Sequence, residues 1–81
     1  MNVYTVKRVD KQLAKLDAMT RQRLQKEMKT LEQWPNTQNI KALDGQLKGS
    51  YRLRVGDWRI LFYRDGDALY ISDVKNRKEA Y

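Results

Sequence analysis

Neither cysteine nor histidine occurs among the 81 residues of this chain. Without cysteine there can be no disulfide framework and no thiolate metal site. Without histidine the chain lacks the commonest general base and the commonest metal-binding side chain. We therefore expect a fold without covalent cross-links, and an activity that uses neither a metal ion nor another cofactor.

Long apolar runs are absent as well. No stretch of about 18 consecutive apolar residues occurs, so no segment is predicted to span a membrane. The N-terminal residues do not combine a charged start with an apolar stretch, as a signal peptide does. We therefore expect a cytoplasmic protein, and the chain length predicts one domain over residues 1–81.

Positive charge is in excess. The chain has 17 Lys and Arg against 10 Asp and Glu, which gives a net charge of +7. Residues 1–40 hold eight basic and four acidic groups, and residues 41–81 hold nine and six. Because the excess is spread along the chain, it is expected on a folded surface rather than on a tail. Such a surface favours a polyanionic partner, such as nucleic acid, an acidic protein or an anionic membrane surface.

The first half of the chain predicts a strand followed by a helix. Residues 2–6 are rich in β-branched and aromatic side chains, which is typical of a strand. Val9, Leu13 and Leu16 then recur at helical spacing and predict one apolar stripe of an amphipathic helix.

A second helix is predicted directly after the first. Thr20 is the expected N-cap, and Met19 and Leu24 are placed to form a hydrophobic staple around it. Pro35 disfavours helical backbone at the residue before it and is expected to end the helix. The two helices predict a helical hairpin.

A β-hairpin is predicted around Gly56-Asp57, because glycine enters the first position of a type II′ turn at little cost. The predicted pairs are Val55 with Trp58, Arg54 with Arg59, Leu53 with Ile60 and Tyr51 with Phe62. One face of this hairpin is apolar or aromatic throughout. The other face carries Arg52, Arg54, Arg59, Leu61 and Tyr63.

A second turn is predicted at Asp65-Gly66, a dipeptide typical of type I′ turns. It predicts the pairs Arg64 with Asp67, Phe62 with Leu69, Ile60 with Ile71 and Arg59 with Ser72. Residues 35–49 are interpreted as a connecting loop. The predicted order is therefore β-α-α-β-β-β, an α+β fold with the helical hairpin packed on one face of a small antiparallel sheet.

Arg54 and Arg59 are predicted to face each other across the hairpin, where like charges destabilise a sheet. Such a pair suggests a negative ligand, and a phosphate backbone is the leading candidate, since the guanidinium group donates two parallel hydrogen bonds. The last strand is expected to end beside the Gly56-Asp57 turn. The basic and phenolic residues expected near that turn are Lys75, Arg77, Lys78 and Tyr81.

Two segments of the second half, residues 47–63 and 74–81, resemble the RelE/ParE superfamily of bacterial toxins, and the preceding helical hairpin agrees with it. The resemblance implies a RelE-like fold and a toxin of a type II toxin–antitoxin system, neutralised by a cognate antitoxin protein. RelE-type members cleave messenger RNA in the ribosomal A site. ParE-type members act against DNA gyrase.

The resemblance also implies roles for single residues. Arg59 matches an arginine that contacts the scissile phosphate, Arg77 matches the arginine after the last strand, and Tyr81 matches the tyrosine that follows it. Arg54 stands at a position that is often lysine in relatives, and Asn76 at one that is often histidine. The predicted catalytic residues are Arg54, Arg59, Arg77 and Tyr81, and the predicted RNA-binding residues are Lys48, Arg52, Lys75 and Lys78.

The identity of a general base stays open, because arginine does not deprotonate in proteins. The candidates are Tyr81, Lys75, Lys48, a carboxylate or a group of the ribosome. The favoured function is a metal-independent, ribosome-dependent endoribonuclease with messenger RNA rather than a small molecule as its substrate. The alternatives are a ParE-type protein that inhibits gyrase and a non-catalytic protein that binds RNA or ribosomes.

Overall fold

Five strands form the sheet of this protein. A computed structural model describes residues 1–43 and 49–76. The strands are β1 (Asn2–Thr5), β2 (Ile40–Ala42), β3 (Ser50–Val55), β4 (Trp58–Asp65) and β5 (Ala68–Asn76). Their order across the sheet is β1-β5-β4-β3-β2, so the last strand along the chain lies inside the sheet.

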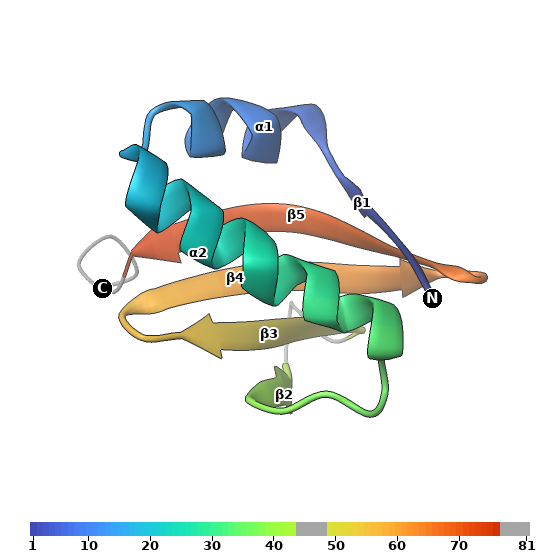
Figure 1. The fold of residues 1–81 in the computed structure, drawn as a ribbon. Helices are drawn as coiled ribbons and strands as arrows, with labels where there is room; N and C mark the ends of the chain where they lie inside the picture. Colours follow the sequence, from blue (N-terminus) through green and yellow to red (C-terminus); the bar gives the residue numbers. More distant parts are fainter. Residues whose placement is uncertain (44–48, 77–81) are drawn as a thin grey trace.

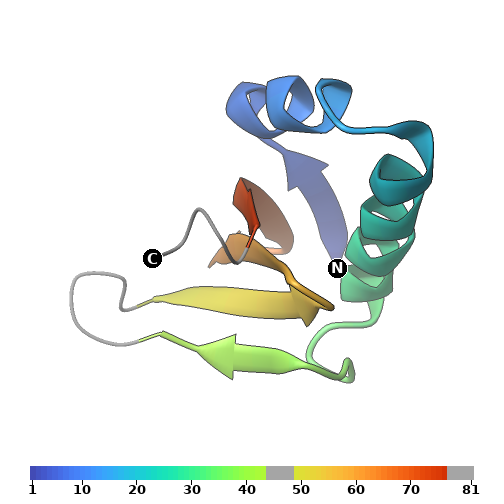
Figure 2. The same ribbon diagram turned by 90° about the vertical axis from the view of Figure 1, so that its left-hand side faces the viewer.

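The helices follow the first strand. They are α1 (Lys7–Ala14), α2 (Ala18–Lys29) and the short 3₁₀ helix η1 (Thr30–Gln33). Figures 1 and 2 show that α2 lies along one face of the sheet, with α1 above it. In the described part of the chain, no helix has the length and apolar character needed to cross a bilayer.

The core fills the space between the helices and this face of the sheet. Val9 and Leu13 of α1 are buried, as the helical spacing predicts, and Leu16 packs against the core from its edge. The sheet contributes alternate residues of its inner strands, as a half-covered sheet requires. The buried apolar residues are Val9, Leu13, Leu24, Met28, Leu31, Leu53, Val55, Ile60, Phe62, Leu69, Ile71 and Val74.

The predicted α+β class is confirmed, and the sheet differs from the prediction in two respects. The segment 35–49 contains β2, which pairs with β3 and is only three residues long, too short for a clear strand signal. The first strand pairs with β5 in parallel, so the sheet is mixed rather than antiparallel. A parallel pair needs a long crossover connection, and the helices and the later strands provide it.

The first hairpin has the predicted register. Val55 pairs with Trp58 and Arg54 with Arg59, and Gly56 has a φ of 60°, as the first position of a type II′ turn requires. The full set of confirmed pairs is Val55 with Trp58, Arg54 with Arg59, Leu53 with Ile60 and Tyr51 with Phe62.

The predicted register of the second hairpin is wrong. Its turn residues are Gly66-Asp67, with Gly66 at a φ of 62°, because the last pair of the ladder is Asp65 with Ala68. The observed pairs include Arg64 with Leu69, Phe62 with Ile71, Ile60 with Val74 and Arg59 with Lys75. A β-bulge between Leu61 and Phe62 accounts for the further shift towards the end of β5.

The start of α2 also differs from the prediction. Asp17 is the N-cap, and its Oδ2 atom accepts a hydrogen bond from the backbone N–H of Thr20 at 3.0 Å. Met19 is 82% exposed, so it forms no hydrophobic staple. The helical region ends at Gln33, two residues before Pro35, as predicted.

Candidate nucleic-acid interface

Three cationic residues lie side by side on adjacent strands, on the sheet face opposite the core. Arg54 of β3 pairs with Arg59 of β4, and Arg59 pairs with Lys75 of β5. We call these three residues the cation row. Neighbouring strands are about 4.8 Å apart, so the row spans roughly 10 Å of backbone. The predicted grouping of Arg54 with Arg59 is therefore confirmed. The shifted turn at Gly66-Asp67 and the β-bulge together bring Lys75 to the place predicted for Ser72.

A second pair of like charges lies next to the row. Arg52 of β3 pairs with Lys41 of β2, and its other neighbour in the sheet is Leu61. The Nε atom of Arg52 is buried and has no hydrogen-bond partner among the described residues. Lys41 was not predicted at this face, because the strand that carries it was interpreted as a loop.

The turn at the end of the row is contacted by two arginines. Arg54 Nε donates a long hydrogen bond of 3.4 Å to the carbonyl oxygen of Gly56. From α2, Arg23 lies so close that a Cβ atom at Gly56 would be 2.8 Å from its Nη2 atom. Arg23 therefore adds a cation to this end of the sheet. The sequence did not predict this contact, because Arg23 stands among the exposed residues of α2.

Asp73, two residues before Lys75 on β5, forms an ion pair with it. Its Oδ2 atom is 3.6 Å from Lys75 Nζ, and its Oδ1 atom is 3.7 Å from Nε of Arg8 in α1. Asp73 is 7% exposed, and Gln12 Nε2 donates a hydrogen bond of 2.7 Å to its carboxylate group. Asp73 thus limits where the Lys75 ammonium group can lie. It was missed in the sequence because its burial depends on the β-bulge.

Four of the predicted site residues, Lys48, Arg77, Lys78 and Tyr81, lie outside the described residues. Asn76, the last described residue, pairs with Trp58 beside the Gly56-Asp57 turn. The last strand therefore reaches this turn as predicted, but with Asn76 beside it rather than residues 72–74.

The cation row can bind a phosphate group. Arginine donates parallel hydrogen bonds to phosphate oxygens and keeps its charge. Within residues 1–43 and 49–76, no three acidic side chains come together as a metal site would need. The chemistry that the two arginines provide is charge stabilisation, and Lys75 is the candidate general base within the row.

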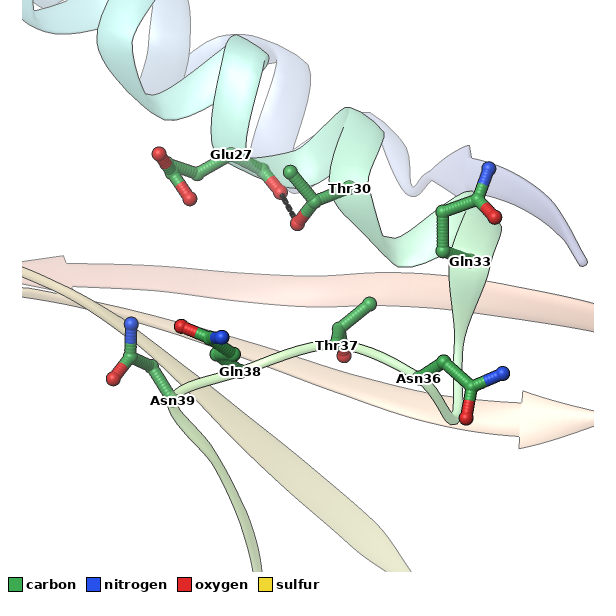
Figure 3. A pocket seen from close by; sticks show the side chains of 7 residues that line it. All are labelled: Glu27, Thr30, Gln33, Asn36, Thr37, Gln38 and Asn39. Carbon is green, nitrogen blue, oxygen red and sulfur yellow. Dashed lines mark hydrogen bonds between the residues drawn. The ribbon is translucent and has the colours of Figure 1, made fainter.

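A separate cavity of about 390 Å³ lies between the end of α2 and the segment that leads to β2 (Figure 3). Its lining is polar, and a hydrogen bond of 2.6 Å from Thr30 Oγ1 to the carbonyl oxygen of Glu27 crosses its wall. The lining residues are Glu27, Thr30, Gln33, Asn36, Thr37, Gln38 and Asn39. None of them is a predicted site residue.

The fold and this face define a small α+β protein with a basic sheet surface. Residues 3–81 match the family model for the ParE toxin of the type II toxin–antitoxin system parDE. The chain therefore belongs to this family of type II toxin–antitoxin toxins, and the resemblance to the RelE/ParE superfamily is confirmed. No curated protein sequence gives a significant match.

Solved toxin structures have the same fold. The RelB–RelE antitoxin–toxin complex from Methanococcus jannaschii is similar, with a TM-score of 0.79 and 26% identity over 96% of this chain and 94% of that chain. The RelBE2 complex from Mycobacterium tuberculosis gives 0.83 and 23%, covering 94% and 96%. The isolated RelE toxin from E. coli gives 0.73 and 15%, covering 93% and 82%. The last two structures are less than 25% identical in sequence to this chain, so their similarity concerns the fold alone.

Proposed function

We propose that this toxin is a ribosome-dependent endoribonuclease that cleaves messenger RNA in the A site and so stops translation in the cytoplasm. The observation that carries the proposal is the cation row, Arg54, Arg59 and Lys75 on adjacent strands. Like charges on directly opposed residues of neighbouring strands destabilise a sheet. An RNA phosphate group bound at the row would offset this repulsion.

The proposed reaction needs no metal ion. The 2′-oxygen of one nucleotide attacks the adjacent phosphorus and loses its proton, and the bond from phosphorus to the 5′-oxygen breaks as that oxygen gains a proton. The products are a 2′,3′-cyclic phosphate and a free 5′-hydroxyl group. Charge on the phosphate oxygens grows in the transition state, where preorganised donors have their largest effect.

The residues divide into two groups in this proposal. Arg59 and Arg77 bind the scissile phosphate with Arg54 in support, and Tyr81 transfers a proton or stacks on a base. The RNA-binding residues are Lys48, Arg52, Lys75 and Lys78. The contact of Lys75 with Asp73 supports a fixed position for its ammonium group at the cation row.

A cognate antitoxin is a further part of the proposal. Two of the similar structures are complexes of a toxin with its antitoxin. The net charge of +7 suits an acidic partner segment.

Cleavage mapping on stalled ribosomes tests the enzymatic proposal. Ribosomes paused on a defined messenger are incubated with the protein, and the 5′ ends of the fragments are mapped. We expect cuts at the A-site codon, a loss of about a hundredfold or more in Arg59→Ala, and no cuts in naked RNA. Arg64→Ala is the matched control. Arg64 is an arginine of the same strand but lies outside the cation row, with its guanidinium group over the ring of Trp34.

The matching family model is that of the ParE toxin. Because ParE-type toxins act against DNA gyrase, inhibition of gyrase is the second candidate function. An intact messenger with normal translation would contradict the endoribonuclease proposal. DNA breaks and an SOS response in cells that express the protein would then support the gyrase alternative. Salt-sensitive binding to ribosomes with intact transcripts would instead support a non-catalytic RNA-binding protein.

A further inference from the structure

Three tyrosine rings form a second row on the face that carries the cation row. Tyr63 of β4 pairs with Tyr70 of β5, and Tyr70 pairs with Tyr4 of β1. The ring centroids are 5.5 Å apart in both contacts, and the ring planes are inclined by 20° and 28°. We call these residues the tyrosine row. Its rings are stacked on one another across three strands.

The tyrosine row lies outside the core. Tyr4 is 49% exposed and Tyr63 is 37% exposed, whereas Phe62, Leu69 and Ile71, which face the other side of β4 and β5, are fully buried. Tyrosine offers a large, rigid surface with a polar tip, and for this reason it is common where proteins bind partners. Several exposed rings in one contiguous patch point to a binding surface.

One end of the row lies beside a small side chain. On the side away from Tyr70, the neighbour of Tyr63 across the sheet is Ser50 of β3. A serine side chain is too small to cover an aromatic ring, so within residues 1–43 and 49–76 the strand neighbour of Tyr63 leaves the outer face of its ring uncovered. A planar group placed there would continue the stack.

The tyrosine row and the cation row are joined by β4. Arg59 and Tyr63 are four residues apart on this strand, which corresponds to about 13 Å, and Leu61 lies between them on the same face. A phosphate group bound at Arg59 therefore places a neighbouring nucleotide within reach of Tyr63. Basic side chains that follow a backbone, with aromatic rings beside them, are the usual means of binding single-stranded nucleic acid.

We propose that the tyrosine row is a base-stacking platform for single-stranded RNA, with a nucleobase on Tyr63 above Ser50. This inference rests on the proposed function for the identity of the polymer. The cation row binds the backbone, and the tyrosine row binds a base of a nucleotide next to the one that is cleaved. Stacking tolerates any base, because each has an aromatic face.

The test measures binding without cleavage. The probe is a fluorescein-labelled 2′-O-methyl oligoribonucleotide of eight nucleotides, which has no free 2′-hydroxyl group to attack the phosphate. Fluorescence anisotropy gives its Kd for the full-length protein, and a series of probes has one abasic site at successive positions. We expect one position at which loss of the base weakens binding about tenfold.

Variants separate the two rows. In Tyr63→Leu and in Ser50→Val the sensitivity to the abasic site should disappear, and in Tyr63→Phe it should remain. Ser50→Val keeps all three tyrosines and suits a strand, so it also tests the platform if Tyr63→Leu folds poorly. Arg59→Ala should keep the sensitivity to the abasic site. It should reduce the steepness of the plot of log Kd against log salt concentration by about 0.7. Met19→Ala, at an exposed position of α2, is the control.

Equal affinity for all probes, or unchanged abasic sensitivity in both Tyr63→Leu and Ser50→Val, would overturn the inference. Loss of affinity for the cognate antitoxin, with RNA binding intact, would assign the tyrosine row to the antitoxin instead. Failure of the cleavage assay would contradict the proposed function and leave the binding results untouched. The two proposals can therefore fail separately.

Discussion

Gln12 of α1 binds both the side chain of Asp73 and the backbone N–H of Val74 in β5. Its Nε2 atom donates to Asp73 Oδ1 at 2.7 Å, and its Oε1 atom accepts from the backbone N–H of Val74 at 2.9 Å. One amide group thus attaches the first helix to the strand segment that carries Lys75. The position of one cation in the row depends on how α1 is packed.

Gln12→Ala should lower the free energy of unfolding by about 1–3 kcal/mol, because a buried carboxylate loses a hydrogen-bond donor. Urea unfolding followed by circular dichroism measures the change. Gln22→Ala, at an exposed position of α2, is the control and should stay within about 0.5 kcal/mol of the wild type. Equal stability of the two variants would show that the amide group contributes nothing.

Arg54→Glu should raise stability and abolish cleavage. The substitution replaces a pair of like charges opposite Arg59 by an ion pair, which is worth about 0.5 kcal/mol, and it reverses the charge that faces the phosphate. Urea unfolding and the stalled-ribosome assay are run on the same preparation. Arg64→Glu is the control for reversed charge on β4. Arg64 pairs with Leu69, so this variant relieves no cross-strand repulsion, and it should lower stability because it loses the contact with Trp34 and the hydrogen bond to the Gly66 carbonyl oxygen. Retained cleavage in Arg54→Glu would contradict the role of the row.

Asp17 should stabilise the protein in a pH-dependent way. Hydrogen bonds from the side chain and the backbone N–H of Thr20 hold the pKa of Asp17 below its ordinary value of 3.8. Because the folded-state pKa is lowered, the contribution is complete above that ordinary value and is lost as pH falls through the folded-state pKa.

Thermal unfolding between pH 7 and pH 2 tests this prediction. The Tm of Asp17→Ala should lie below that of the wild type at pH 7, and the gap should narrow below pH 3.8. Asp17→Asn keeps an uncharged N-cap, so its Tm difference from Asp17→Ala should not change with pH. A constant gap between the wild type and Asp17→Ala would exclude the charge as its cause.

The two turn glycines should respond to alanine differently. Both have a positive φ, so each Gly→Ala substitution should lower stability by about 1–2 kcal/mol. A Cβ atom at Gly56 also comes within 2.8 Å of Arg23, whereas one at Gly66 meets nothing within 4 Å. Gly56→Ala should therefore be the more harmful by a few tenths of a kcal/mol. The difference should vanish in an Arg23→Ala background.

The first hairpin could be predicted because its sequence allows one register. Gly56 supplies the positive φ, and a slip of one residue in the register would turn apolar side chains of β3 towards solvent. The second hairpin was harder, because Asp65-Gly66 and Gly66-Asp67 are both plausible turns. The pairs Phe62 with Leu69 and Phe62 with Ile71 both join buried residues, so the pattern of the core could not decide between them.

The site could be predicted in part for the same reason. Arg54 opposite Arg59 follows from the first turn alone. Lys75 reaches Arg59 through the β-bulge beside Leu61, and no local residue pattern marks that bulge. Lys41 depends on a three-residue strand and Arg23 on helix packing, which both arise from contacts distant in sequence.

The position of β5 between β1 and β4 has a consequence for synthesis. Residues 68–76 leave the ribosome after all the other described elements, yet β1 finds its partner only there. Before β5 has been synthesised, the earlier strands cannot form a continuous sheet. The pairing of β1 with β5 closes a loop of more than sixty residues, which slows folding. A chain interrupted before Ala68 would have neither row complete. The cation row and the tyrosine row are therefore completed together, once β5 has been synthesised.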